Sequence, residues 1–227
     1  MKLRILVGSL LVWGSFPGWA MPGIGALALS GGRSFCAFSP FLNRSEKIEE
    51  SASFQVKKGD RKADAEQLAR ALDYFSSEKF HECLVLLQPL NRRYKLNPRY
   101  RAYLAVCLYY EWEYAEAIRL FDEVIPLLQG LAPHELSLYY WMDAESYFAL
   151  QQYDRALPLY EKMLPLCRDN EKPDAYYRMG FCHLFAEERK KAKECFELSL
   201  EGYLKYRNTP NEQARIAQIR HMIGGLK

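Results

Sequence analysis

The feature that most constrains this fold is a repeat with small residues at fixed positions. Each copy places a small residue in a helix-forming segment, at Cys83, Ala117, Ala156 and Ala192, with spacings of 34, 39 and 36 residues. A second small residue lies twelve residues earlier in each copy, at Ala71, Ala105, Ala144 and Gly180. A bulky apolar residue lies four residues after each member of the first set, at Leu87, Phe121, Tyr160 and Phe196.

The clearest copy, residues 100–125, contains two short amphipathic segments. Apolar residues recur there at intervals of three and four, which is the spacing of one helix face. They are Leu104, Ala105 and Leu108 in the first half, and Ala117, Phe121 and Val124 in the second. Glu111, Trp112 and Glu113 supply a turn between them. One such hairpin cannot bury its own apolar face, so the copies are expected to stack.

This pattern resembles that of the tetratricopeptide repeat (TPR) family, of an exported bacterial type, over roughly residues 62–206. The resemblance implies an all-α superhelix of about four helix-turn-helix repeats (61–207). Cys83 departs from the usual alanine, and Asp143 occupies a position that often holds leucine. Residues 128–132 are extra; we interpret them as a longer loop in which Gly130 ends one helix and Pro133 begins the next.

The C-terminal segment 208–227 is predicted to be a capping helix over the last repeat. Thr209-Pro210-Asn211-Glu212 has the form of a capping box, and Ile216, Ile219 and Ile223 line one face. A terminal helix with a polar outer face covers the apolar end of a solenoid and keeps it soluble. The tail is similar to the ending of TPR proteins of the Tol–Pal and outer-membrane β-barrel assembly systems.

Residues 1–20 are predicted to be a signal peptide. Lys2 and Arg4 precede an uncharged stretch from Ile5 to Gly32, and small residues favour cleavage after Ala20, with Ala28 as a second choice. The protein would then be periplasmic or secreted. The alternative is an inner-membrane anchor formed by residues 5–29. Residues 21–60 are interpreted as a partly disordered linker.

The charge balance argues against nucleic-acid binding. The whole chain has 31 Lys and Arg, 28 Asp and Glu and a net charge of +3, of which Lys2 and Arg4 belong to the signal segment. Nucleic-acid binders carry a much stronger basic excess. A membrane contact is expected only if the N-terminal segment is uncleaved.

The TPR resemblance implies that the first helix of each repeat lines a concave groove. This groove binds a peptide or helix of another protein. Aromatic side chains suit such capture because they bury large areas at low entropic cost. The residues at these positions are Arg99, Tyr109, Tyr110, Trp141, Glu145, Phe148, Tyr177, Phe181 and Phe185. Two alternatives are open: the side chains pack the repeat interfaces, or segment 35–58 fills the groove.

No catalytic, metal or cofactor site is predicted. The six cysteines form no C-x-x-C motif, no histidine pair completes a zinc set, and no nucleophile–base pair stands out. The cysteines are interpreted as small buried apolar residues. In an oxidising compartment a disulfide becomes available, for which Cys167 with Cys182 is our choice.

The sequence therefore predicts a non-enzymatic interaction scaffold in the bacterial cell envelope. Two alternatives share the same fold: a chaperone for a secreted or translocator protein, and a structural subunit that forms homo-oligomers. A chaperone-tail adaptor is disfavoured, because Leu68, Leu72 and Tyr103 occupy the positions where a carboxylate clamp needs Lys and Asn.

Overall fold

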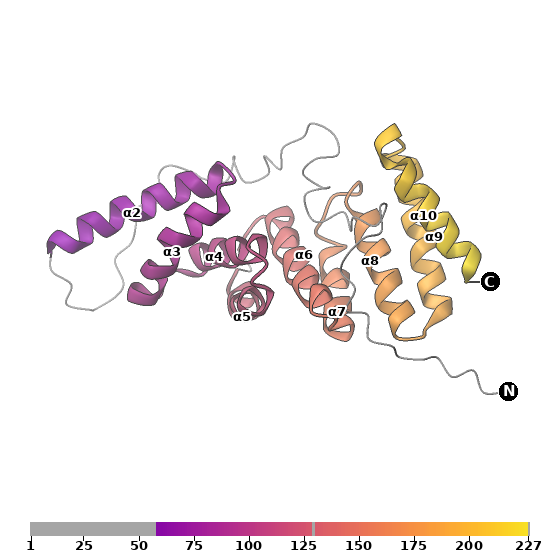
Figure 1. The fold of residues 1–227 in the computed structure, drawn as a ribbon, viewed down its shortest axis with the longest axis horizontal. Coiled ribbons are helices and arrows are strands. Elements are labelled where there is room, and N and C mark those ends of the chain that lie inside the picture. The colour runs from indigo at the N-terminus through magenta and orange to yellow at the C-terminus, as the bar shows by residue number, and fades with distance from the viewer. Residues whose placement is uncertain (1–57, 129, 227) are drawn as a thin grey trace, which may run out of the picture. The chain divides into compact units, whose positions relative to one another are not determined.

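The computed structural model describes residues 58–128 and 130–226, which form helices joined by short turns (Figure 1). In chain order these are α2 (Lys58–Ser76), α3 (Phe80–Tyr94), α4 (Pro98–Tyr110), α5 (Tyr114–Val124), η2 (Ile125–Leu127), α6 (Pro133–Ala149), α7 (Tyr153–Met163), α8 (Lys172–Phe185), α9 (Arg189–Tyr206), η3 (Pro210–Glu212) and α10 (Gln213–Gly225). The predicted N-terminal signal or anchor lies outside the described residues, as does all but the end of the predicted linker.

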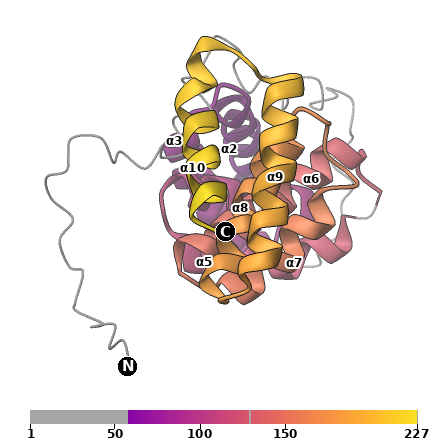
Figure 2. The ribbon, with the colours of Figure 1, turned by 90° about the vertical axis from the view of Figure 1, so that its right-hand side faces the viewer.

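The helices pack as consecutive pairs. Helix α2 lies against α3, α4 against α5, α6 against α7, and α8 against α9, and each pair also contacts the next. Figure 2 shows α10 lying along α9 at the C-terminal end. The predicted all-α superhelix of four helix pairs with a capping helix is confirmed. Among the described residues, no helix combines the length and the apolar character needed to cross a membrane.

The small repeat residues lie inside the stack. All seven small residues other than Gly180 are 0% exposed, and so are the four bulky residues that follow. At Gly180 the two helices approach closely, because an added Cβ would lie 2.7 Å from the Phe196 ring. The ring of Phe196 fills the space that a side chain would occupy, so glycine is required at this position.

The turns inside the four pairs share one geometry. Glu78, Trp112, Gln151 and Glu187 all have left-handed backbones with φ between 58° and 64°. In each turn the following amide donates to a carbonyl five residues earlier, as Glu113 does to Leu108 at 2.9 Å. This is the Schellman ending of a helix, usually formed with glycine. The turn predicted at residues 111–113 is present, and Trp112 is 75% exposed on it.

The long junction between the second and third pairs differs from the prediction. Helix α5 continues directly into η2, whose capping residue is Leu128, and Gly130 does not adopt a left-handed backbone. Gly130 is therefore not the residue that ends the helix, because the 3-10 turn has already ended it. Pro133 begins α6, as expected.

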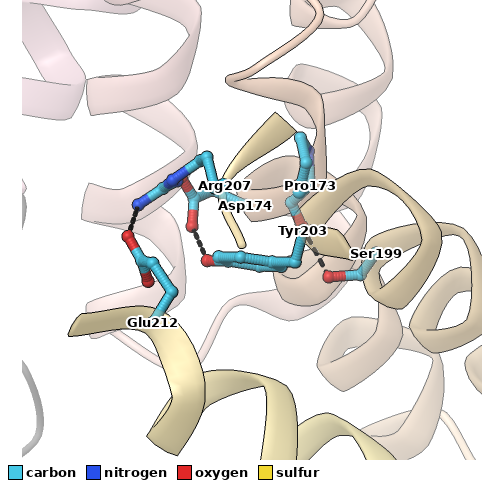
Figure 3. Close-up of polar contacts among 6 residues, drawn as sticks. All are labelled: Pro173, Asp174, Ser199, Tyr203, Arg207 and Glu212. Carbon is cyan, nitrogen blue, oxygen red and sulfur yellow. Dashed lines mark hydrogen bonds and ion pairs between the residues drawn. The ribbon is translucent and has the colours of Figure 1, made fainter. Parts of the chain in front are cut away.

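Side-chain contacts fasten the C-terminal end of the stack (Figure 3). Asp174 of α8 accepts hydrogen bonds from Tyr203 and Arg207, and Arg207 also binds Glu212. Ser199 donates to the Pro173 carbonyl at 2.7 Å. The buried residues of this end include Tyr177, Phe196, Tyr203, Ile216 and Ile219.

The predicted capping box at 209–212 is not formed. The Thr209 side chain makes no capping hydrogen bond, and residues 210–212 form η3, so that α10 begins at Gln213. The physical reason is a competing partner, because the Glu212 carboxylate is held by Arg207 rather than by the backbone of Thr209.

Asp143 of α6 is a buried carboxyl group at a position where an apolar residue is usual. It is 1% exposed, and its Oδ1 has no hydrogen-bond partner among the described residues. Burial, together with the charge of Asp122 on α5, raises the pKa of Asp143 to about 8, against the smaller opposing effects of Lys162 and Arg155 on α7. The Asp122 carboxylate itself accepts a hydrogen bond of 2.6 Å from Tyr147.

We expect Gly180→Ala to destabilise the fold by about 1–3 kcal/mol, since the new methyl group overpacks the contact with Phe196. Urea denaturation measures this change. Gly224→Ala is the matched control, because its added Cβ meets no atom within 4 Å. That variant is expected to be neutral or stabilised by up to about 1 kcal/mol. Equal effects of the two substitutions would contradict the close contact.

Asp143 is expected to make stability depend on pH. Its folded-state pKa lies above the value in the unfolded chain, so its contribution is greatest below about pH 4 and declines as pH rises to about 8. The free energy of unfolding of Asp143→Asn, measured relative to wild type, should therefore increase across this range. The exposed Asp154→Asn is the control, and a pH-independent difference for Asp143→Asn would refute this origin.

Candidate partner-binding face

A row of contacting rings runs across the third and fourth helix pairs. Phe148 of α6 contacts Tyr153 of α7 with ring centroids 5.0 Å apart, and Tyr153 stacks on Phe185 of α8 at 4.3 Å. Phe185 lies 6.2 Å from Phe181, which in turn lies 4.9 Å from Tyr177. We call these five residues the aromatic row. It brings together four of the nine predicted site residues.

The aromatic row is exposed mainly at Phe185, whose side chain remains 53% exposed after stacking on Tyr153. Phe148 and Phe181 are half-buried, whereas Tyr177 is 5% exposed, with the Arg215 guanidinium 4.3 Å from the centre of its ring. A large apolar side chain held in one position and left in water is suited to contact with another apolar surface.

An ion pair between a buried carboxylate and a half-buried arginine lies beside the row. Arg178 of α8 donates to Glu145 of α6 at 2.6 Å, and Tyr160 of α7 donates to the other oxygen of the same carboxylate. The guanidinium also lies 4.7 Å from the centre of the Phe148 ring. Burial alone would lower the pKa of Arg178, but the charge and hydrogen bond of Glu145 and the neighbouring Tyr160 and Tyr109 together outweigh it and raise that pKa. The pair fixes α8 against α6 and so fixes where Phe181 and Phe185 lie.

A second set of stacked rings joins the first and second helix pairs. Tyr110 of α4 stacks on Phe80 of α3 with centroids 3.9 Å apart and planes 2° from parallel. Tyr109 is 1% exposed and contacts the edges of Tyr110 and Tyr114. Burial raises the pKa of Tyr110 to about 12. Tyr109 therefore fills the interior, and Tyr110 is half-buried at the boundary between pairs.

The remaining two predicted residues also contact neighbouring elements. Arg99 of α4 makes two hydrogen bonds to Glu135 of α6, at 3.0 and 3.3 Å, and Tyr139 donates to the same carboxylate at 3.0 Å. Trp141 is half-buried with its ring 5.5 Å from that of Tyr160. Both side chains thus have their main contacts inside the stack.

Two residues beside the predicted set have contacts that the sequence analysis did not find. Tyr153 is the central ring of the aromatic row, and the signal for it is that aromatic residues also occupy its repeat position at Phe80 and Tyr114. Arg178 is the partner of Glu145. Its only sequence signal is a basic residue between the tyrosines and the methionine in the middle of α8.

The described cysteines are free thiols, namely Cys83, Cys107, Cys167, Cys182 and Cys195. Cys167 and Cys182 belong to different core clusters, so the suggested disulfide between them is absent. Cys36 lies outside the described residues. Within the ranges that the structure describes, no group of three His, Cys, Asp or Glu side chains is arranged to hold a metal ion.

Comparison of structures places the fold among TPR-like helical-repeat proteins. MamA residues 41 to the end from Desulfovibrio magneticus RS-1 matches with a TM-score of 0.52 and 16% identity, over 72% of this chain and 92% of that one. A MamA point mutant matches with a TM-score of 0.55 and 14% identity, over 73% and 90%. The apo form of RapI matches with a TM-score of 0.55 and 12% identity, over 72% and 62%.

At these identities the likeness is one of fold. No protein-family model matches the sequence, and a search of curated proteins gives no match. The chain is therefore defined at the level of its architecture, as a TPR-like helical-repeat protein.

We expect Arg178→Met to destabilise the stack by about 3–5 kcal/mol, because it leaves the buried Glu145 carboxylate unpaired. The double variant Arg178→Met with Glu145→Leu should recover most of that loss. Urea denaturation of wild type, the two single variants and the double variant measures both the loss and its recovery.

Lys172→Met is the matched control. Lys172 is also on α8, and its substitution removes an exposed ion pair with Asp169. Its cost is expected to be below about 1 kcal/mol. An Arg178→Met variant as stable as the Lys172→Met variant would show that the Glu145 pair contributes little.

Proposed function

We propose that this protein is an interaction scaffold that binds a peptide or helix of another protein. The binding face is the exposed side of the aromatic row, formed by Phe185, Phe181 and Phe148. The observation that carries the proposal is the position of Phe185. Its ring is held by Tyr153 on one side and is 53% exposed on the other.

The chemistry of this face favours an apolar protein segment. Rings that are already fixed by stacking lose little side-chain entropy when a partner covers them, so most of the buried area is available as binding free energy. Arg178 is engaged by Glu145 and Phe148, which leaves Phe185 as the main recognition element. An amphipathic helix or an extended segment with one large apolar side chain fits these requirements.

The proposed place of action is the bacterial cell envelope. The support is the N-terminal sequence, in which Lys2 and Arg4 precede an uncharged run with small residues at a cleavage position. Mass spectrometry of the mature N-terminus after cell fractionation tests this. A start at Met21 or Leu29 outside the cytoplasm agrees with export, whereas an intact Met1 in the cytosol rules it out.

Phe185→Ala is expected to weaken partner binding by about thirtyfold, the loss of roughly 2 kcal/mol that is usual for an aromatic hot spot. A photo-crosslinking amino acid at position 185 first captures the partner in native cells. Isothermal titration with that partner then measures the affinity of wild type and variant. Trp141 and Phe181 are less suitable, because each packs against a core cluster.

Two matched positions control for exposure alone. Leu198→Ala removes a 45% exposed apolar side chain from α9, and Trp112 supplies a 75% exposed crosslinking position on a turn. Neither lies on the proposed face, so Leu198→Ala should bind like wild type and a crosslinker at position 112 should not capture the partner. A folded Phe185→Ala variant that binds with unchanged affinity would refute this face as the binding site.

A further inference from the structure

Positive charge is concentrated around the junction between the first and second helix pairs. From residue 83 to residue 110 the chain contains five Lys and Arg residues and no Asp or Glu. Two of the five are engaged inside the stack, because Arg99 binds Glu135 and Arg101 binds Glu123. The other three are exposed at the end of α3 and just after it, at Arg92, Arg93 and Lys95.

The start of α2 brings two more cations to the same place. Asp64 of α2 joins the two helix ends, since it accepts hydrogen bonds from Arg93 at 2.6 and 2.7 Å and another from Tyr94. Arg61 and Lys62 are exposed in the turn of α2 before Asp64. We define the cationic patch as Arg61, Lys62, Arg92, Arg93 and Lys95.

The cationic patch keeps an excess of positive charge. Among the described side chains of these two helix ends, the acids are Asp64, which Arg93 and Tyr94 already engage, and Glu66. Arg93 remains 51% exposed after binding Asp64. Five cations that share one surface with two carboxylates attract an anionic partner.

An exposed apolar turn lies beside the cationic patch. Helix α4 packs on α3 and also contacts η2, and Arg101 near the start of α4 binds Glu123 at the end of α5. The start of α4 therefore lies between the end of α3 and η2. In η2, Leu127 is 61% exposed and Pro126 is exposed too. The chain carries no charged residue from 124 to 133.

We propose that the cationic patch and Leu127 form a docking surface for an anionic phospholipid bilayer. Lys and Arg side chains near such a bilayer are attracted by its surface charge, and an exposed apolar side chain gains by entering the boundary between headgroups and acyl chains. A nucleic acid or an acidic peptide would also pair with the cations. The bilayer is favoured because it supplies both a continuous negative surface and an apolar layer for Leu127.

This contact is separate from the partner-binding face and from the N-terminal segment. It is formed by residues 61–127, so it is available to a chain that has lost its signal peptide. Phe185 lies at a turn within a pair, whereas the cationic patch and Leu127 lie at junctions between pairs, at the opposite ends of the helices. Docking on a bilayer therefore leaves Phe185 open to a partner.

The test is a titration of the full chain with vesicles of phosphatidylglycerol and phosphatidylcholine, and with vesicles of phosphatidylcholine alone. An uncleaved N-terminal segment enters bilayers by itself, so the readout has to be local. A fluorescent amino acid at position 127 should be quenched by brominated acyl chains in the anionic vesicles and not in the neutral ones. The same probe at position 112, on an exposed turn within a pair, should not be quenched in either.

Arg92→Gln with Lys95→Gln should raise the concentration of anionic lipid needed for half-maximal quenching by about thirtyfold. Each Lys or Arg near an anionic membrane contributes about fivefold to binding. Glutamine suits both positions, because Arg92 is exposed and Gln151 has a left-handed backbone like that of Lys95.

Arg189→Gln with Lys190→Gln is the matched control, since it removes the same charge from two exposed residues of α9. Salt at about 0.1 M screens charges beyond about 10 Å, so this variant should bind within about twofold of wild type. The proposal is overturned if the probe at position 127 is not quenched or if the two double variants weaken binding equally. It is also overturned if a DNA duplex or polyglutamate binds the patch while anionic vesicles do not.

Discussion

The close approach of two helices at Gly180 and Phe196 shows the constraint on which the whole stack depends. A side chain on one helix must be absent or very small so that a large ring or a branched side chain from its partner can fill the contact. The other three pairs have alanine or cysteine in the small positions and a fully buried bulky residue in the large one. Because the contacts recur, the pairs have a similar geometry and can pack in series.

The sequence predicts this scaffold well because packing in a repeat is local. The small residues, the turn at Trp112 and the helix start at Pro133 all depend on neighbours within about forty residues. The exposure of the predicted binding residues could not be predicted in the same way. Tyr109 is buried and Tyr110 half-buried although they are adjacent, since the outcome depends on Phe80 and Tyr114 from two different copies. The Glu145 contact likewise required the position of Arg178.

Buried and half-buried carboxylates are satisfied in this protein by a tyrosine and an arginine together. Glu135 binds Tyr139 and Arg99, Glu145 binds Tyr160 and Arg178, and Asp174 binds Tyr203 and Arg207. The first group lies between the second and third pairs and the second between the third and fourth, whereas the last joins α8 to the end of α9 within the fourth pair. Asp143 lacks such a set, and its raised pKa leaves it protonated at neutral pH, which is the low-cost state for an unpaired buried acid.

The different polar groups at successive junctions also determine how such a protein is able to evolve. A solenoid of identical units lengthens or shortens by gain or loss of whole units, because each unit accepts any other as a neighbour. Here, deletion of the fourth unit would remove Arg178 and leave the Glu145 carboxylate buried without its cation. Duplication of the third would supply a carboxylate with no arginine to face it. Charge pairing therefore opposes a change in the number or the order of the units, whereas single exposed residues can change without breaking it.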